Sequence, residues 1–298
     1  MVLITEVSLR DGLQIEPVVV PTADKVRFGQ LLVEAGFQHL EVGSFVSPAR
    51  VPTMADTAEV VAGLADQPAT LHTLVLNERG AQRAVEAGVE NARLVMSASE
   101  GHSESNSGVS TGEAMQRLAR AAEVLHDAGV RTEGCIATAF VCPFDGDTPV
   151  ERVVRVAQHY ERIGVDVLHL ADTIGAASPS DITRAVTAVR EVFPIERVGL
   201  HLHSTYGMAD ANAWEAYRCG IRRFDAALGG LGGCPFAPGA TGNIAADDLI
   251  HLFHREGIDT GIDVSKLGEL REHLAGLVGH PLPSALAKVP AVPAEVRR

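Results

Sequence analysis

The chain has 298 residues, of which 46% are hydrophobic, and a formal net charge of −13. Because nucleic acids and anionic membranes attract surplus Lys and Arg, this acidic balance argues against both as partners. The sequence shows no apolar stretch of about 18 residues, as a transmembrane helix would need, and no signal-peptide pattern at its amino terminus. The cysteines at positions 135, 142, 219 and 234 form no CxxC pair, which suits a reducing cytoplasm.

Short β-rich runs alternate with helical stretches, such as 111–129 and 149–164, and most of the helical stretches end at a glycine. This alternation predicts parallel strands with right-handed crossovers. Eight such units favour an α/β fold of the (β/α)8 TIM-barrel type over an open doubly wound sheet. The predicted strands span 2–8, 38–45, 69–76, 92–99, 133–140, 165–172, 197–204 and 222–229.

No linker-like or low-complexity segment interrupts the series, so we expect one domain over residues 1–298. The barrel should cover about 1–258, with a helical extension over about 259–298. Within this extension we expect an extra helix over 263–279 and a loose, Pro-rich end over 281–298.

In barrels of this kind the active site lies at the carboxyl ends of the strands. Polar residues of this sequence collect there: Arg10 and Asp11 end the first strand, Glu41 lies late in the second, Asp172 ends the sixth, His201 and His203 lie late in the seventh, and Cys234 and Asn243 follow the eighth. His39 and His169 also lie in predicted strands, and we interpret both as core residues.

The sharpest pattern is "HLHS" at 201–204. Residues two apart on a strand point to the same face, so His201 and His203 should present both imidazoles to one metal ion. Oxygen ligands nearby would be Asp11 and the side-chain carbonyl of Asn243. Nitrogens combined with oxygens favour Mg²⁺ or Mn²⁺, with Zn²⁺ as the alternative. A pair of histidines satisfied by hydrogen bonds in a polar core layer is the competing interpretation.

Three further residues have both a functional and a structural interpretation. Glu41 in an otherwise apolar strand needs a buried partner, and Arg10 is the expected one. Asp172 before Thr173 is either a site carboxylate or a turn cap. Cys234, in the glycine-rich segment 228–243, is either an inert thiol or one that a closing loop brings onto a substrate.

Five motifs together closely resemble 3-hydroxy-3-methylglutaryl-CoA lyase, a family of TIM-barrel metal-dependent C–C lyases. They are "SLRDGLQIE", "LEVGSFVSP", "ADTIG", "HLHSTYGMADAN" and "GLGGCPFAPGATGNIAADDL", in the family's order between about residues 4 and 254. The resemblance implies Asp11, His201, His203 and Asn243 as metal ligands, and Asp172 and Glu41 as active-site carboxylates. It also implies Cys234 as the catalytic thiol, and an acyl-CoA substrate bound in part through Arg10, Gln14 and Asn106. A homodimer is implied as well.

The implied reaction is a retro-Claisen cleavage that gives acetyl-CoA and acetoacetate, or the corresponding keto acid. Asp172 or His201 would remove the proton of the tertiary hydroxyl group. Arg10 would stabilise the enolate, and Cys234 would protonate it.

Two stretches depart from the family pattern. After "RDGLQ" the family usually has Asn, Glu and Lys, whereas this chain has Ile15, Glu16 and Pro17. After "SASE" the family usually has basic residues, whereas Glu104 lies here. These changes point to a different acyl group or different contacts with the CoA phosphates, to which Arg50 could contribute.

Three other functions compete with the lyase reaction. A Claisen synthase would join acetyl-CoA to an α-keto acid on the same barrel, but the cysteine loop favours the lyase. A metal-dependent hydrolase would carry its HxH pair on the first strand. A non-catalytic acyl-CoA-binding barrel would have no need of every matched ligand and the thiol.

Overall fold

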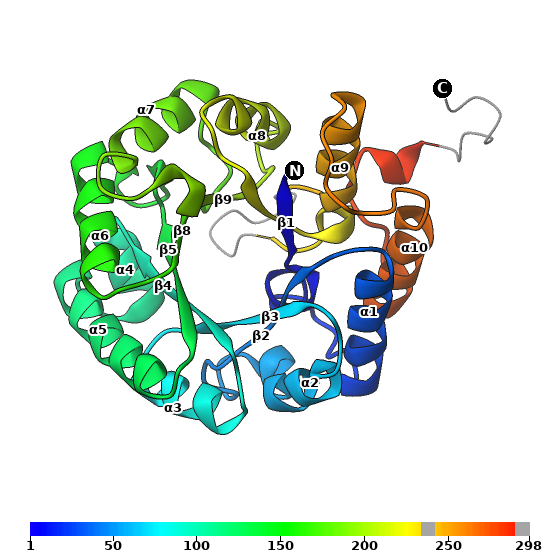
Figure 1. Cartoon of the computed structure of the whole chain (residues 1–298), viewed down its shortest axis with the longest axis horizontal. Coiled ribbons are helices and arrows are strands. Elements are labelled where there is room, and N and C mark those ends of the chain that lie inside the picture. The colour runs from blue at the N-terminus through cyan, green and yellow to red at the C-terminus, as the bar shows by residue number, and fades with distance from the viewer. Residues whose placement is uncertain (234–241, 290–298) are drawn as a thin grey trace.

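Eight parallel strands close into a barrel in the computed structural model, which describes residues 1–233 and 242–289 (Figure 1). The strands follow the order β1-β10-β9-β8-β5-β4-β3-β2, and β10 closes the barrel by pairing with β1. The predicted TIM barrel and its eight strands are thus confirmed. They are β1 (Leu3–Glu6), β2 (His39–Ser44), β3 (Thr70–Val75), β4 (Asn91–Ser97), β5 (Arg131–Ala137), β8 (Val167–Asp172), β9 (Val198–Leu202) and β10 (Arg223–Ala226).

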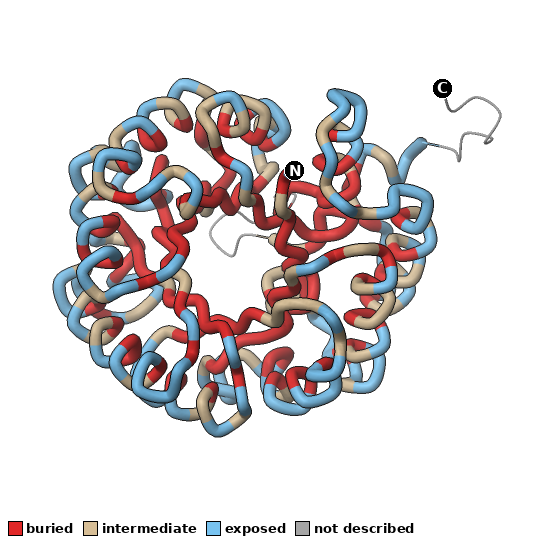
Figure 2. Tube along the Cα trace, viewed as in Figure 1, coloured by how far each residue is buried: buried red, intermediate tan, exposed pale blue. Residues whose placement is uncertain are grey.

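A helix on the outside of the barrel follows each strand. The strands form a buried inner ring, and the exposed residues lie on the outer sides of the helices (Figure 2). In the described part of the chain, no helix combines the length and apolar character needed to cross a membrane. The surrounding helices are α1 (Thr22–Glu34), α2 (Thr57–Leu64), α3 (Glu78–Glu86), α5 (Thr111–Asp127), α6 (Val150–Arg162), α7 (Pro179–Val189), α8 (Ala209–Arg218) and α9 (Ala246–Arg255).

The packing of α6 on β5 shows how residue choice fixes this layering. A β-carbon added to Gly134 would lie 2.7 Å from the ring of Tyr160. Glycine at this point therefore lets the buried tyrosine approach the strand. The Tyr160 hydroxyl group shares its one hydrogen between the backbone carbonyls of Leu94 and Cys135, 2.8 Å and 3.1 Å away. One helix residue thus ties β4 and β5 together.

The first strand is shorter than predicted. It ends at Glu6, and Ser8–Gly12 forms a π-helical turn, η1, with the Gly12 amide donating to the carbonyl of Val7. The cause is the side chain of Glu6, which accepts the Ser8 amide at 3.0 Å and so turns the chain away from the sheet. The expectation that Arg10 and Asp11 end the first strand is therefore wrong, because both lie in this turn.

The carboxyl-terminal extension contains the expected extra helix, α10 (Leu267–Val278). The segment after it is anchored up to residue 289, contrary to the expectation of a loose end from 281. The Ser284 hydroxyl group donates to Asp247 at 2.8 Å, and Asp248 accepts the amides of Ala285 and Leu286. Two features were not predicted from the sequence: α4 (Glu100–Ser107) and the hairpin of β6 (Val141–Cys142) and β7 (Gly146–Asp147).

Candidate active site

Three of the predicted metal ligands meet at the carboxyl end of the barrel. One side-chain ligand atom each from Asp11, His201 and His203 lies within 4.8 Å of the others. The turn η1 supplies Asp11, whereas His201 comes from β9 and His203 follows it directly. The two histidine Nε2 atoms are 3.2 Å apart, and each lies within 4 Å of Asp11 Oδ2. Both histidines are buried, and Asp11 connects the cluster to the surface.

Asn243 completes this arrangement. Its Nδ2 donates to Asp11 Oδ2 at 2.7 Å and to the carbonyl of Leu231 at 3.1 Å. An isolated antiparallel β-bridge pairs the backbones of Asn243 and His203 and so holds Asn243 beside the cluster. The buried Oδ1 atom of Asn243 has no hydrogen-bond partner among the described residues. Because an unpaired buried oxygen is costly, this atom is a natural ligand for a cation.

Charges around the cluster keep its ligands in the forms that bind metals. Burial would raise the pKa of Asp11, but Arg10 and the two histidines hold it well below its usual range. Burial, together with the charge of His201, lowers the pKa of His203 to about 4 despite Asp11 nearby. At neutral pH the cluster therefore offers an ionised carboxylate and a neutral imidazole at His203, a donor set that suits Mg²⁺, Mn²⁺ or Zn²⁺.

Arg10 and Glu41 form the buried pair expected from the sequence. Nε and Nη2 of Arg10 lie 2.8 Å and 2.7 Å from Oε2 of Glu41, and Nη1 contacts the carboxylate of Asp11. Glu41 is fully buried and Arg10 nearly so. The guanidinium is therefore held in one orientation beside the metal-ligand cluster, where it can stabilise negative charge on a bound substrate.

Glu6 braces the turn that carries Arg10 and Asp11, a role that sequence reasoning missed. Its carboxylate accepts the hydroxyl and amide of Ser8, and also the amide of Leu228, 2.9 Å away across the barrel closure. Burial raises the pKa of Glu6 to about 7, while these hydrogen bonds act to lower it. The feature of the sequence that could have indicated this role is the carboxylate of Glu6 after the apolar residues of the first strand.

Asp172 lies at the end of β8, as predicted, but its described hydrogen bonds close its own loop. The carboxylate oxygens accept the amides of Ala176 and Ala177 at 3.0 Å and 3.1 Å. These two hydrogen bonds agree with the interpretation of Asp172 as a turn cap. Burial raises its pKa to about 6, against the lowering effect of those hydrogen bonds. Asp172 is not part of the three-residue cluster.

The remaining predicted site residues are less closely tied to the cluster. The backbone carbonyl of Gln14 accepts the Thr53 hydroxyl group at 2.7 Å, and Asn106 lies exposed on α4. Ile15 is 43% exposed and approaches Gly233, where an added β-carbon would lie 2.7 Å from its Cδ1. Cys234 falls outside the described residues.

A charged layer inside the barrel was also missed. Arg93 on β4 is buried against Asp225 of β10 and Glu133 of β5, with nitrogen–oxygen distances of 2.5 Å and 2.9 Å. His169 belongs to this layer: its Nε2 is 3.4 Å from Arg93 Nη2 and its Nδ1 is 3.4 Å from Asp225. The core interpretation of His169 therefore fits its position.

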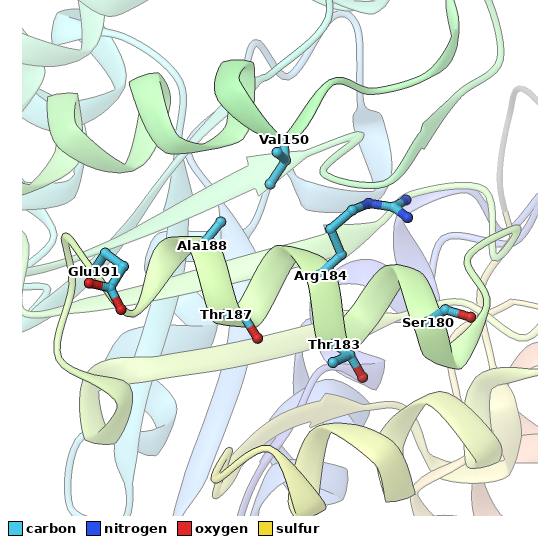
Figure 3. Close-up of a pocket in the computed structure, with 7 residues that line it drawn as sticks. All are labelled: Val150, Ser180, Thr183, Arg184, Thr187, Ala188 and Glu191. Carbon is cyan, nitrogen blue, oxygen red and sulfur yellow. The ribbon is translucent and has the colours of Figure 1, made fainter.

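A separate hollow lies on the outer wall between α6 and α7. Val150 faces the α7 side chains Ser180, Thr183, Arg184 and Thr187, with Ala188 and Glu191 at one end (Figure 3). Arg184 is already paired with Asp181 of its own helix. The hollow contains none of the cluster residues, so the chemistry is expected at the barrel end.

Comparisons with known proteins agree on one family. The HMGL-like family matches residues 1–274. An (R)-citramalyl-CoA lyase from Chloroflexus aurantiacus is 41% identical, with 96% of this chain and 94% of that protein covered. The hydroxymethylglutaryl-CoA lyase YngG from Bacillus subtilis is 38% identical, with 95% of each covered.

A solved structure resembles the whole chain. It is an HMG-CoA lyase from Acinetobacter baumannii in complex with coenzyme A and 3-methylmalate. The two share 40% identity and a TM-score of 0.94, over 100% of this chain and 97% of that one.

Proposed function

Because the chain belongs to the HMGL-like family and is a lyase-type enzyme, we propose that it cleaves 3-hydroxy-3-methylglutaryl-CoA to acetyl-CoA and acetoacetate with the help of a divalent cation. The observation that carries the proposal is the convergence of Asp11, His201 and His203 beside the unpaired Oδ1 of Asn243. We assign these four residues as ligands of Mg²⁺ or Mn²⁺. When bound, the cation would polarise the substrate oxygens and lower the pKa of its hydroxyl group.

The protein's own residues supply the proton transfers and charge stabilisation. A base takes the proton of the tertiary hydroxyl group, and the electron pair left on oxygen forms a ketone as the C–C bond breaks. The bonding electrons pass to the acetyl-CoA fragment as an enolate, whose charge faces the guanidinium of Arg10. The enolate then takes up a proton at its carbon atom. We assign Cys234 as the donor of this proton.

Asp172 is our choice as the base. Nδ1 of His201 faces Asp225 at 3.2 Å, and its Nε2 faces the metal cluster, so neither nitrogen is left for a substrate proton. The two oxygens of Asp172 offer about four lone pairs, more than its backbone hydrogen bonds occupy. A pKa of about 6 also suits proton abstraction near neutral pH.

A second substrate is favoured by the relative with 41% identity, which is named for (R)-citramalyl-CoA. Citramalyl-CoA also carries a tertiary hydroxyl group on the carbon β to the thioester carbonyl, and breaking the bond between its α and β carbons gives acetyl-CoA and pyruvate in place of acetoacetate. The solved relative bound to coenzyme A and 3-methylmalate supports a pocket for CoA beside a hydroxy dicarboxylate. The exposed Ile15 beside Gly233 makes this part of the mouth apolar.

The two substrates are separated by offering each CoA ester with Mg²⁺ and measuring acetyl-CoA, acetoacetate and pyruvate. Acetoacetate formed faster at equal concentration would support the hydroxymethylglutaryl substrate, and pyruvate formed faster would replace it with citramalyl-CoA. EDTA and Cys234→Ala should each abolish either reaction. Release of neither keto acid would contradict the proposal. A second assay supplies acetyl-CoA and an α-keto acid, and their net condensation would favour a synthase.

The homodimer and the cytoplasmic location belong to the same proposal. The three described cysteines are free thiols, which a reducing compartment would preserve. Sedimentation equilibrium of the purified protein would measure the oligomeric state, and a monomer at micromolar concentration would contradict the dimer.

A further inference from the structure

The buried charges inside the barrel reach the metal-ligand cluster through one carboxylate. Asp225 on β10 is fully buried, and its Oδ2 atom lies 3.2 Å from Nδ1 of His201. The same atom is 2.5 Å from Nη1 of Arg93, which comes from β4. Because β4 and β10 are separated by three strands in the barrel, this contact crosses the barrel interior. Asp225 therefore stands between Arg93 and a predicted metal ligand.

The contact with Asp225 decides which nitrogen of His201 carries the proton. An ionised carboxylate can only accept hydrogen bonds, and both oxygens of Asp225 already accept N–H groups of Arg93, Oδ2 from Nη1 at 2.5 Å and Oδ1 from Nη2 at 3.2 Å. Nδ1 of His201 must then donate. Its Nε2, which faces His203 and Asp11, is left with a free lone pair for a cation.

We infer that Asp225 and Arg93 are positioning residues for the metal site: Asp225 fixes the tautomer and ring orientation of His201, and Arg93 holds Asp225 in place. A carboxylate behind a metal-binding histidine typically raises metal affinity by about 10- to 100-fold. The inference rests on the proposed metal site but is independent of which CoA ester is cleaved.

Arg93 has contacts that fit this role. Both Nε and Nη2 bind Oε2 of Glu133, at 3.2 Å and 2.9 Å, which fixes the plane of the guanidinium. Its Nη1 also lies 3.9 Å from Oε1 of Glu41, the carboxylate that holds Arg10. Asp225, the partner of His201, and Glu41, the partner of Arg10, thus both lie beside the buried guanidinium of Arg93.

Such a layer would be a poor choice for stability alone. Buried ion pairs often contribute no more than apolar residues of similar volume, because desolvation offsets their attraction. Leu168 and Leu200 alternate with His169 and His201 and so point to the opposite face of their strands, where they are buried and apolar. The charges are thus confined to the face of these strands inside the barrel. A role in holding the site explains why charges lie here.

The test is the affinity of the metal-stripped protein for Mn²⁺, measured by titration calorimetry. Asp225→Asn keeps the shape of the side chain but removes its charge, and should weaken Mn²⁺ binding about 10- to 100-fold. Arg93→Lys keeps the charge but loses the planar fork, and should weaken binding in the same direction. Because both act through one contact, the double variant should bind Mn²⁺ nearly as well as Asp225→Asn.

A control separates positioning from a general loss of buried charge. Asp56 pairs with the buried Lys25 at 2.6 Å, between α1 and α2. Asp56→Asn should lower the melting temperature and leave the Mn²⁺ affinity unchanged. The ¹⁵N spectrum of the histidine side chains gives a second measurement: metal-free wild type should show His201 protonated at Nδ1, and Asp225→Asn should shift it toward Nε2.

Wild-type Mn²⁺ affinity in Asp225→Asn, or an unchanged His201 tautomer, would overturn the inference. Failure of the wild type to bind Mn²⁺ would overturn it together with the proposed metal site. Mn²⁺ binding without cleavage of either CoA ester would overturn the proposed substrate alone, and leave the affinities to decide the roles of Asp225 and Arg93.

Discussion

Glu41 holds the guanidinium of Arg10 through two N–H groups that share a single carboxylate oxygen, Oε2, at 2.8 Å and 2.7 Å. This geometry leaves Nη1 directed at Asp11, so Arg10 lies between the strand carboxylate and a predicted metal ligand. The position of the positive charge therefore depends on Glu41, which is itself fully buried on β2.

Replacing Glu41 should release Arg10 from its orientation. We expect Glu41→Gln to lower kcat/KM for cleavage by about 100-fold, a loss comparable to removing one donor to a developing oxyanion. The matched control is Glu113→Gln, which breaks the exposed pair with Arg117 on α5 and should leave the rate unchanged. Steady-state acetyl-CoA formation measures both. Wild-type kcat/KM in Glu41→Gln would show that the pair has no part in positioning Arg10.

The proposed base should be visible in the pH dependence of the rate. Burial raises the pKa of Asp172 to about 6, so the carboxylate form increases as the pH passes this value. The logarithm of kcat/KM should rise up to about pH 6 and then level off, whereas Asp172→Asn should be slower by about 100-fold or more and lack this limb. Asp181→Asn, which alters the capping box of α7 and the pair with Arg184, should keep this limb but move it to lower pH, because the charge of Asp181 helps to raise the pKa of Asp172. If Asp172→Asn keeps the rise in kcat/KM up to about pH 6, Asp172 is not the base and only closes its own loop.

Glu6 should make the folded protein less stable as the pH rises. The pKa of Glu6 is about 7 in the folded protein and 4.5 in an unfolded chain, so between these values the folded state binds a proton that the unfolded chain has released. The stability from this group is complete below about pH 4.5 and is lost as the pH rises through about 7.

Glu6→Gln removes this titration. From pH 5 to 7.5 the free energy of unfolding should fall less steeply in the variant than in the wild type, by up to roughly 3 kcal/mol. Urea denaturation at a series of pH values measures the difference. Parallel curves for the two proteins would mean that Glu6 keeps an ordinary pKa in the folded state.

Asn243 should contribute an oxygen to the metal site. Asn243→Ala removes the unpaired Oδ1 and the hydrogen bond to Asp11, and we expect Mn²⁺ affinity to fall by at least about 10-fold. Asn91→Ala is the matched control, because Asn91 is also buried but lies at the start of β4, where it donates to the carbonyl of Leu71. Equal losses of affinity in the two variants would remove Asn243 from the ligand set.

The barrel could be predicted from the sequence because its cues are local. Apolar runs, helical periodicity and terminal glycines each span a few residues, and the alternation of strand and helix allows few topologies. The HxH pair was equally accessible, since its spacing on a strand fixes its direction. The assignment of the whole chain to one domain stays a prediction.

The contacts that cross the barrel could not be predicted, because they depend on how distant strands meet. Arg93 and Asp225 are 132 positions apart and come from strands that are not neighbours. The only local feature that marks these two positions is a charged residue inside an apolar strand, as at Glu41. That feature predicts a buried partner but does not identify it. The π-helical turn at Ser8–Gly12 was missed for a related reason: the Glu6 carboxylate that turns the chain at Ser8 is itself held by the amide of the distant Leu228.

The central claim is that the cluster of Asp11, His201, His203 and Asn243 holds the cation needed for C–C cleavage. The most direct test adds Mn²⁺ stepwise to metal-stripped protein and follows site occupancy by calorimetry and acetyl-CoA formation in the same samples. We predict that the two curves superimpose and that His203→Asn loses both. Cleavage by the metal-stripped protein at the full rate, or undiminished Mn²⁺ binding by His203→Asn, would contradict the account.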